Sequence, residues 1–432
     1  MRCFPAVMLL LMYQLIAMPP GLYASSDQCV AVSDLRDHHF HATDWNYRTE
    51  GGRHLILEYT GKNPVFESSI MRIKKPVSWA DDTFADYPDH LFIQEYIKPY
   101  ARKNWFPEEK IVTPGREFYQ SIFEQSISYR PKNRIEALPF KSETQASIQT
   151  DIMSLSPDGI TVEIKPKSGI IPNSIYISPQ NQIKKEHIPF TLMQLFKLTK
   201  GKTQTLSAYN PADLYSKQKK RIEQSLRALF RHPQNNLKLY KNGVWIDSTE
   251  IQKLEEVNST LYHQLIEDLS VILIQDPVLD FLKQLQSLDT IDTEGAWTLI
   301  NPQYTKYFFE LSDADFWKPG LWNPVSDPKR PEDLIVVATE KDQKKAGAHP
   351  DLSREQIRSL LQQYLIAAAA KDCSLLIHIF KNRSQPGKAP DWSLSVVDIG
   401  KKSVKKIPRN FEKDYEIVSL WNNTINESAE AK

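Results

Sequence analysis

The chain has 432 residues, of which 41% are hydrophobic, and this length predicts two or three lobes or domains rather than one small core. It carries 54 basic and 53 acidic residues, and the formal net charge of +1 excludes a general electrostatic attraction to nucleic acid or to an anionic membrane. Three cysteines are too few for a disulfide framework or a cysteine-based zinc site. Any anion site must therefore be a local concentration of lysine and arginine.

The first 24 residues have the pattern of a secretory signal peptide. Arg2 precedes the apolar stretch Phe4–Met18, which is followed by helix-breaking residues and a small residue at the expected cleavage point. The stretch is short for a membrane span, and an uncleaved anchor is the alternative interpretation. We therefore expect an exported protein that has no stable membrane span after signal cleavage. Residues 25–44 form a polar arm, in which Asp37 and its neighbouring histidines are expected to be solvated rather than to bind a metal.

A glycine-containing β-hairpin is predicted between residues 45 and 75. Gly51-Gly52 precede the apolar run His54–Tyr59, and a second strand, Phe66–Lys75, follows a turn at Gly61. A glycine turn between strands can lie over nucleotide phosphates, because backbone N–H groups approach closely where there is no Cβ. Most such hairpins are simply turns, so the pattern alone is a weak indication of nucleotide binding.

The stretch Thr161–Gly169, TVEIKPKSG, has the alternation of a strand with one apolar and one charged face. Gly169 and Pro172 indicate that the strand ends directly after its charged residues. Charges at the end of a strand, beside a sharp connection, are typical of ligand sites in mixed α/β proteins. A surface edge strand is the alternative. The charged face carries Glu163, Lys165 and Lys167.

Helices are predicted through the middle of the chain. Phe190–Leu198 suits a short helix that carries Lys197, and Thr260–Ser287 reads as two helices separated near Asp276-Pro277. A capping box at Ser353 opens a further helix. Between these, one apolar stripe at helical spacing is expected to be core: Ile222, Leu226, Leu229 and Phe230.

Two aspartates are predicted to meet at one end of a second hairpin. Asp372 precedes the expected strand Leu375–Phe380, and Asp398 lies near the end of the expected strand Trp392–Ile399. If these strands pair antiparallel, the start of the first lies beside the end of the second. One carboxylate can then take a proton from a hydroxyl while the other holds Mg²⁺ on nucleotide phosphates, as in protein kinases. An isolated aspartate at a strand end is more often a cap or turn residue.

Polar residues in two loops are candidates for phosphate contacts. The first loop follows the helix that ends at His232-Pro233, and a structural turn is an equal interpretation of it. The second is the basic run GKKSVKKIPR directly after Asp398. A run of charges is usually a solvated face, but this run lies close to the predicted metal ligand. These loops carry Asn235, Asn236, Lys238, Lys402 and Lys406.

Taken together, these stretches resemble the inositol-pentakisphosphate 2-kinase family. The resemblance is carried by WNYRTEGGRHLILEYTG, IMRIKK, TVEIKPKSG, YNPADLYS, HPQNNLKLYKNG, LDTIDTEGA, YLIAAAAKDCS and VVDIGKKSVKKIP, in the family's order from about Trp45 to Leu420. It implies a two-lobed kinase-like fold of the α/β (α+β) class, with mixed or antiparallel sheets and helices. The lobes are expected at residues 45–167 and 168–420, followed by a disordered tail at 421–432.

The resemblance also implies an activity: phosphorylation of the 2-hydroxyl of inositol 1,3,4,5,6-pentakisphosphate to give inositol hexakisphosphate, with ATP and Mg²⁺, by a monomer that binds no nucleic acid. Asp372 would be the catalytic base, assisted by Lys165, and Asp398 the Mg²⁺ ligand. The nucleotide would be held by Gly51, Gly52, Arg72, Asp151, Glu163 and Lys238. The inositol phosphate would be held by Arg134, Lys167, Lys197, Asn235, Asn236, Lys402 and Lys406.

Several positions depart from the family's usual residues. Thr49 stands in place of a glycine, Thr150 of an asparagine, Met193 of a histidine and Asn410 of a tyrosine, and Lys238 and Lys406 stand in place of arginines. Lysine cannot form arginine's bidentate fork. Two alternatives therefore stay open: a catalytically silent binder of inositol phosphates and nucleotides, and a kinase for another inositol polyphosphate. Because ATP and this substrate are cytosolic, export suggests delivery into a host cell.

Overall fold

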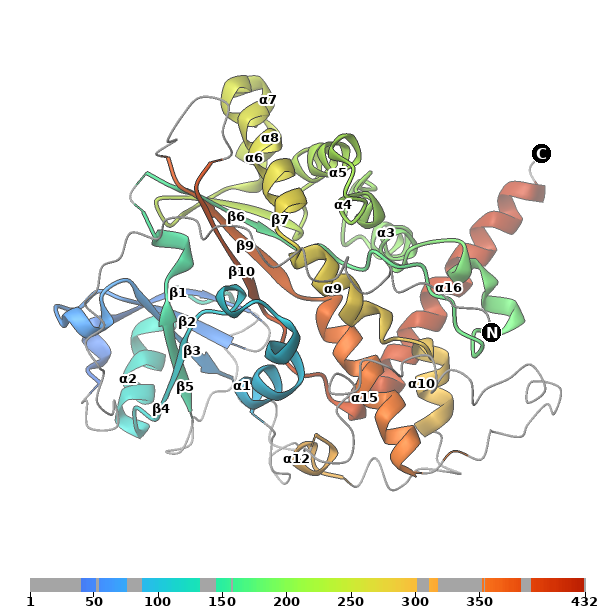
Figure 1. Ribbon diagram of the computed structural model, residues 1–432, viewed down its shortest axis with the longest axis horizontal. Helices are drawn as coiled ribbons and strands as arrows, with labels where there is room; N and C mark the ends of the chain where they lie inside the picture. Colours follow the sequence, from blue (N-terminus) through green and yellow to red (C-terminus); the bar gives the residue numbers. More distant parts are fainter. Residues whose placement is uncertain are drawn as a thin grey trace, which may run out of the picture. The chain divides into compact units, whose positions relative to one another are not determined.

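The computed structural model describes residues 40–51, 54–75, 88–132, 145–156, 158–300, 311–317, 352, 354–381 and 390–430. The predicted signal peptide, Gly52, Arg134 and Ser353 lie outside the described residues. The elements below all belong to one unit of the chain, residues 41–432. Figure 1 shows two β-sheets with helices around them, which confirms the predicted mixed α/β class.

The first sheet is antiparallel and has the strand order β1-β2-β3-β5-β4. The predicted strand His54–Tyr59 is confirmed as β2, whereas the next strand begins at Ser69 rather than at Phe66, because Pro64–Phe66 form a 3-10 turn capped by Asn63. The five strands are β1 (Trp45–Glu50), β2 (His54–Tyr59), β3 (Ser69–Lys74), β4 (Glu109–Val112) and β5 (Ala146–Thr150).

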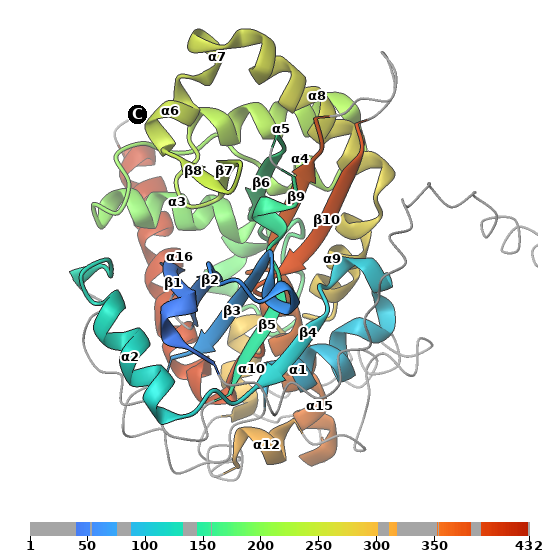
Figure 2. The ribbon, with the colours of Figure 1, turned by 90° about the vertical axis from the view of Figure 1, so that its left-hand side faces the viewer.

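Short helices accompany the first sheet. The helix α1 (Asp89–Phe92) continues into a π-helical turn, Ile93–Ile97, and α2 (Arg116–Ser126) packs against β1, as Figure 2 also shows. The 3-10 turn η9 (Ile152–Ser154) follows β5 and leads to the second sheet.

The second sheet is also antiparallel and has the order β10-β9-β6-β7-β8. Its central strand, β6, holds the first part of TVEIKPKSG, and Val162 and Ile164 are fully buried. The first lobe is predicted to extend to residue 167, whereas β6, at Ile160–Ile164, pairs within the second sheet. The strands are β6 (Ile160–Ile164), β7 (Leu237–Lys241), β8 (Val244–Ile246), β9 (Ser374–Ile379) and β10 (Trp392–Val397).

Helices pack around the second sheet, and their bounds agree with most of the sequence predictions. The predicted stripe from Ile222 to Phe230 is buried on α5, and α8 and α9 separate at Asp276-Pro277. The helices are α3 (Pro189–Thr199), α4 (Pro211–Leu214), α5 (Lys219–Arg231), α6 (Ser248–Gln252), α7 (Leu254–Val257), α8 (Ser259–Gln275), α9 (Val278–Ser287), α10 (Asp292–Ile300), α12 (Asp313–Phe316), α15 (Arg354–Ala370) and α16 (Ile407–Glu430).

The expected disordered tail is wrong for residues 421–430, which belong to α16. The helix continues because it has a partner: α16 packs against α3, and the Trp421 indole Nε1 donates a hydrogen bond to the Leu192 carbonyl over 2.8 Å. Ile417 and Val418 are buried on the same helix. Among the helices of the described residues, none combines the length and apolar character needed to cross a membrane.

Candidate active site

The strand register brings the two aspartates to the same end of the second sheet. In the β9–β10 pair, Ser374 lies opposite Val397. Asp372 precedes the first of these residues by two positions, and Asp398 directly follows the second. The predicted antiparallel pairing is therefore confirmed, and with it the common location of the two carboxylates.

Asp398 connects the two sheets. Its backbone has a left-handed φ of 60°, and β10 ends at Val397, directly before it. Arg72, on β3 of the first sheet, donates from Nη2 to Oδ1 of Asp398 over 2.9 Å. Burial raises the pKa of the Asp398 carboxyl, but the charge and hydrogen bond of Arg72, together with the charge of Lys165, hold the pKa below its ordinary value. Asp398 is therefore an anion at neutral pH.

The Asp398 carboxylate fits a hard cation. Half of its side-chain surface is exposed, and Oδ2 has no hydrogen-bond or ion-pair partner within the described part of the chain. Mg²⁺ is usually bound by one or two carboxylates together with substrate phosphates and water, so a single open carboxylate oxygen suits it. The residue is thus placed and charged as the predicted Mg²⁺ ligand requires.

Asp372 lies between two lysines. Lys402 donates from Nζ to Oδ2 over 3.0 Å, and the Nζ of Lys167 lies 3.5 Å from Oδ1. Burial raises the pKa of the Asp372 carboxyl, but the charges of Lys402 and Lys167 outweigh it and hold the pKa below its ordinary value. The site therefore presents an exposed carboxylate flanked by ammonium groups, which could accept a hydrogen bond from a substrate hydroxyl while the lysines contact phosphates.

Glu163 is an acidic residue on β6, the central strand of the second sheet. It is buried on β6, and Lys238, its register partner on β7, donates to Oε2 over 2.9 Å. Ser374 donates to Oε1 over 3.0 Å, and Tyr240 to Oε2 over 3.4 Å. Burial lowers the pKa of the Lys238 ammonium, but Glu163 more than compensates and raises it. The pair predicted to contact the nucleotide is thus assembled as one hydrogen-bonded unit.

The connection between the sheets is held by an ion pair that the sequence analysis did not include. Arg48 on β1 pairs with Asp151 directly after β5, and also donates to the Gly243 carbonyl over 3.2 Å. The Asp151 N–H donates to the Ser68 carbonyl over 2.8 Å, and Oδ1 of Asp151 caps η9 by accepting from the Met153 N–H. In the sequence, only the location of Arg48 beside the Gly51-Gly52 turn, in YRTEGG, indicates that it could lie near the site.

Lys197 and Asn236 extend the polar site. Burial lowers the pKa of the Lys197 ammonium, and the positive charges of Lys167, Lys413 and Lys202 lower it further. Asn236 is 1% exposed, yet neither its amide nitrogen nor its oxygen has a partner among the described residues. An unpaired buried amide is costly, and its presence in this region favours a ligand contact.

The structure gives less information on the roles of the other predicted site residues. Gly51 closes the β1–β2 turn through a bond from its N–H to the His54 carbonyl. Asn235 and Lys406 are exposed. The neighbouring Lys401, in contrast, is 2% exposed and pairs with Asp313, so the basic run does not act as one surface.

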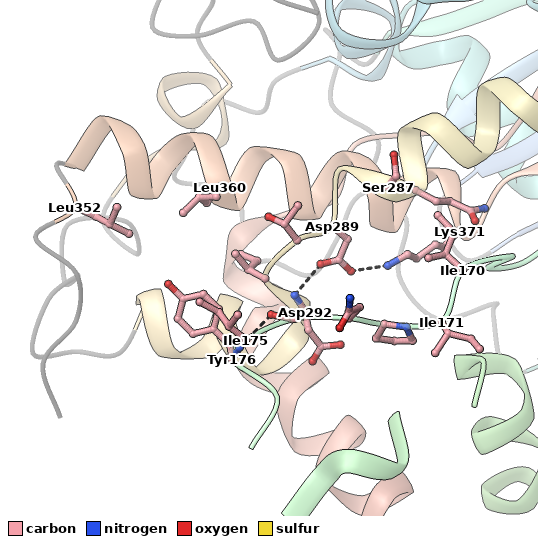
Figure 3. Close-up of a pocket in the computed structure, with 16 residues that line it drawn as sticks. Ile170, Ile171, Ile175, Tyr176, Ser287, Asp289, Asp292, Leu352, Leu360 and Lys371 are labelled. Carbon is pink, nitrogen blue, oxygen red and sulfur yellow. Dashed lines mark hydrogen bonds and ion pairs between the residues drawn. The ribbon is translucent and has the colours of Figure 1, made fainter. Parts of the chain in front are cut away.

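A cavity of about 240 Å³ lies between the segment 170–176, the turn 286–292 and α15. In Figure 3 the Asp289 carboxylate points toward Lys371 in its wall, and the two are 2.5 Å apart. None of the predicted site residues lines this cavity. Gln286 lines the cavity and also donates to the Lys167 carbonyl, so the cavity borders the predicted active site without including its predicted residues.

Comparison with known proteins agrees with this geometry. The sequence model of the inositol-pentakisphosphate 2-kinase family matches residues 47–416. Proteins named inositol-pentakisphosphate 2-kinase are similar to the chain: one from Arabidopsis thaliana is 25% identical over 88% of this chain and 94% of the relative. One from Oryza sativa subsp. japonica is 26% identical over 89% and 94%. One from Cryptococcus neoformans is 25% identical over 88% and 93%. The chain belongs to the inositol-pentakisphosphate 2-kinase family.

Proposed function

We propose that the protein is an ATP- and Mg²⁺-dependent kinase that phosphorylates the 2-hydroxyl of inositol 1,3,4,5,6-pentakisphosphate to give inositol hexakisphosphate. The observation that carries the proposal is the division between the two aspartates. Asp372 is flanked by lysines, whereas Asp398 is oriented by an arginine from the opposite sheet. One carboxylate is thus available to a hydroxyl and the other to a metal–nucleotide complex, within one site.

The residues near Asp372 suit the acceptor substrate. An inositol pentakisphosphate concentrates many negative charges in a small volume, and Lys167, Lys197 and Lys402 supply positive charge around the carboxylate. As an anion, Asp372 accepts a hydrogen bond from the substrate hydroxyl, orients it and takes its proton as the phosphoryl group is transferred. Little covalent chemistry is required of the protein, so positioning and charge neutralisation are its main contributions.

The residues near Asp398 suit the nucleotide. Asp398 would hold Mg²⁺, which when bound neutralises charge on the nucleotide phosphates. Arg72 lies on the strand beside the Gly51 turn and carries a charge that suits the same phosphates. Glu163 and Lys238 are the polar pair for the ribose side, and Asp151 lies at the connection between the sheets, where adenine would bind. Residues of both sheets thus take part.

A turnover assay tests this proposal. Purified protein is incubated with Mg²⁺, ATP and inositol 1,3,4,5,6-pentakisphosphate, and the products are separated by anion-exchange chromatography. We expect inositol hexakisphosphate from the wild type and a loss of about 10²- to 10⁴-fold in kcat for Asp372→Asn. The matched control is Asp158→Asn, which removes an exposed carboxylate paired with Lys381 and should leave kcat unchanged.

Two other results of the assay would favour the alternatives. Thermal stabilisation by the substrate and by ATP without any product would indicate a silent binding protein. Turnover of a different inositol polyphosphate would indicate a kinase with another substrate specificity. The first substitutions to test would then be Met193→His on α3 and Asn410→Tyr on α16, which restore the family's usual residues. Absence of both turnover and stabilisation would refute the proposal.

We further propose that the protein is exported and reaches its substrates inside a host cell. The support is the signal-like composition of residues 1–24 together with an enzyme class whose substrates are cytosolic. Fractionation of cells that express the tagged full chain, followed by N-terminal sequencing, tests this. We expect a mature N-terminus near residue 25. A chain that keeps its first residues and stays with the producing cell's cytosol would refute it.

A further inference from the structure

The backbone directly after β6 adopts an unusual conformation in the active site. Lys167 has a left-handed φ of 59°. Residues with a Cβ rarely adopt this backbone conformation unless the surrounding structure enforces it. Its ammonium lies 3.5 Å from Oδ1 of Asp372. The direction of this side chain therefore depends on whatever holds the Lys167 backbone in place.

We infer that Gln286 and Tyr215 are positioning residues, which hold Lys167 in the left-handed conformation from which its ammonium serves the acceptor substrate. This inference rests on the proposed function and adds to it two residues from α9 and from the turn after α4. Neither residue was a candidate in the sequence analysis. Neither is placed in contact with the substrate.

The hydrogen bonds form a closed arrangement around the Lys167 carbonyl. Gln286 donates from Nε2 to this carbonyl over 2.9 Å and to the Tyr215 hydroxyl over 2.9 Å. The Tyr215 hydroxyl donates to the same carbonyl over 3.1 Å. Oε1 of Gln286 accepts from the Gly169 N–H over 2.9 Å. One amide thus fixes the backbone on both sides of Ser168.

Burial makes this arrangement specific. Gln286 is 1% exposed and Tyr215 is 6% exposed, so water does not readily substitute for either partner. A Cβ on Gly169 would lie 2.3 Å from Cδ2 of Tyr215, which shows that the tyrosine ring occupies the space a side chain would need. The glycine of TVEIKPKSG is therefore the residue that lets Tyr215 reach the Lys167 carbonyl.

A second contact stabilises the preceding residue. The Tyr209 hydroxyl donates to the Pro166 carbonyl over 2.9 Å, so successive carbonyls are each held by a buried tyrosine. The Gln286 and Tyr215 contacts are directed at Lys167 itself, whose side chain is 20% exposed and faces Asp372. Without them the backbone would relax to a negative φ and the ammonium would leave the carboxylate.

The variants Gln286→Met and Tyr215→Phe test the inference, because both keep the size of the side chain and remove its hydrogen bonds. We expect kcat/KM for inositol pentakisphosphate to fall by roughly 10- to 100-fold and the KM for ATP to change by less than about twofold. The control is Gln284→Met on the same helix, where the side chain is exposed and the kinetics should be unchanged.

A double-mutant cycle with Lys167→Ala separates positioning from general destabilisation. If Gln286 acts through Lys167, the double variant Gln286→Met/Lys167→Ala should have a kcat/KM within about twofold of that of Lys167→Ala alone. A pH profile gives a second readout. Asp372 is faced by Lys402, Lys167 and Lys165, so displacing one cation should move the acidic limb of kcat/KM to higher pH in Gln286→Met. The inference would be overturned if the fold losses in kcat/KM of the two single variants multiply in the double variant and the acidic limb of the pH profile is unshifted in Gln286→Met.

A readout that needs no turnover distinguishes this inference from the proposed function. Competitive acetylation followed by mass spectrometry measures how readily Lys167 reacts in the free protein. We expect faster acetylation of Lys167 in Gln286→Met and Tyr215→Phe than in wild type or Gln284→Met. Wild-type protein that lacks kinase activity but shows this change would refute the proposed function and leave the positioning role standing. Unchanged acetylation would refute the positioning role.

Discussion

One buried ammonium joins three carboxylates beneath α16. Lys184 is 3% exposed, and its Nζ bonds to Asp292, to Oδ2 of Asp414 over 2.5 Å and to Oε1 of Glu294 over 3.4 Å. We predict that Lys184→Met lowers the free energy of unfolding by about 3–5 kcal/mol at pH 7, because it leaves buried carboxylates without their counter-charge. Lys185→Met, at the neighbouring, less buried position, is the control and should change stability by less than about 0.5 kcal/mol.

The same cluster predicts a pH dependence with a defined sign. Burial raises the pKa of Asp292 to about 6; Lys184 opposes this, and the carboxylates of Asp414 and Asp289 add to it. Because this pKa exceeds the ordinary value of 3.8, the folded state binds more protons than the unfolded state between these pH values. The contribution of Asp292 is therefore favourable at low pH and is lost as the pH rises through about 6. By pH 7 the loss is about 3 kcal/mol.

Asp292→Asn isolates this contribution. Asparagine tolerates the left-handed φ of 61° at this position and can still accept the bond from the Glu294 N–H. Urea unfolding of wild type and variant at pH 4.5, 6 and 7.5 should show the variant gaining stability relative to wild type as the pH rises. A difference that is constant across this range would show that Asp292 does not titrate as argued. A cost below about 1 kcal/mol for Lys184→Met would refute the counter-charge role.

Three further predictions concern the site. Arg72→Leu should lower kcat/KM for ATP by roughly 10- to 100-fold, because Asp398 loses its 2.9 Å partner, with little change in KM for the inositol phosphate; initial-rate kinetics check this. Gly159→Ala should destabilise by about 1–3 kcal/mol in urea unfolding, since a Cβ would lie 2.3 Å from Nε2 of His378. Lys197→Met should raise the KM for inositol pentakisphosphate about tenfold, whereas Lys200→Met, at an exposed position on the same helical segment, should not.

The location of the two aspartates could be predicted from sequence because it depends on few assumptions. Two strands of suitable length, separated by a turn, pair antiparallel in most proteins, and the ends that meet follow from this alone. The observed register of Ser374 with Val397 confirms the reasoning. The alternation of β6 was predictable for the same reason, because strand periodicity assigns Glu163 and its neighbours to faces without knowledge of the rest of the fold.

Contacts between distant segments could not be predicted in this way. Lys401 and Lys402 are adjacent in one basic run, yet the first is buried against Asp313 and the second reaches Asp372. No local sequence pattern distinguishes the two lysines. Their environments differ because α12 packs beside Lys401 and places Asp313 next to its ammonium. The same holds for residues 421–430 of α16, which are predicted to be a disordered tail, whereas the Trp421 indole bonds to α3 and the helix continues. Propensity is a weak prior where tertiary packing decides.

The charge balance of the site explains why the acceptor should be a polyanion. The charges of Lys165, Lys167, Lys202 and Lys413 all lower the pKa of Lys197, so these ammonium groups are close enough to repel one another. The Asp372 carboxylate offsets only part of this repulsion, because it pairs with Lys402 as well as with Lys167. A ligand with several phosphates would relieve more of it than a single carboxylate can. The same repulsion that destabilises the free site would then favour binding, in proportion to the number of phosphates that the lysines reach.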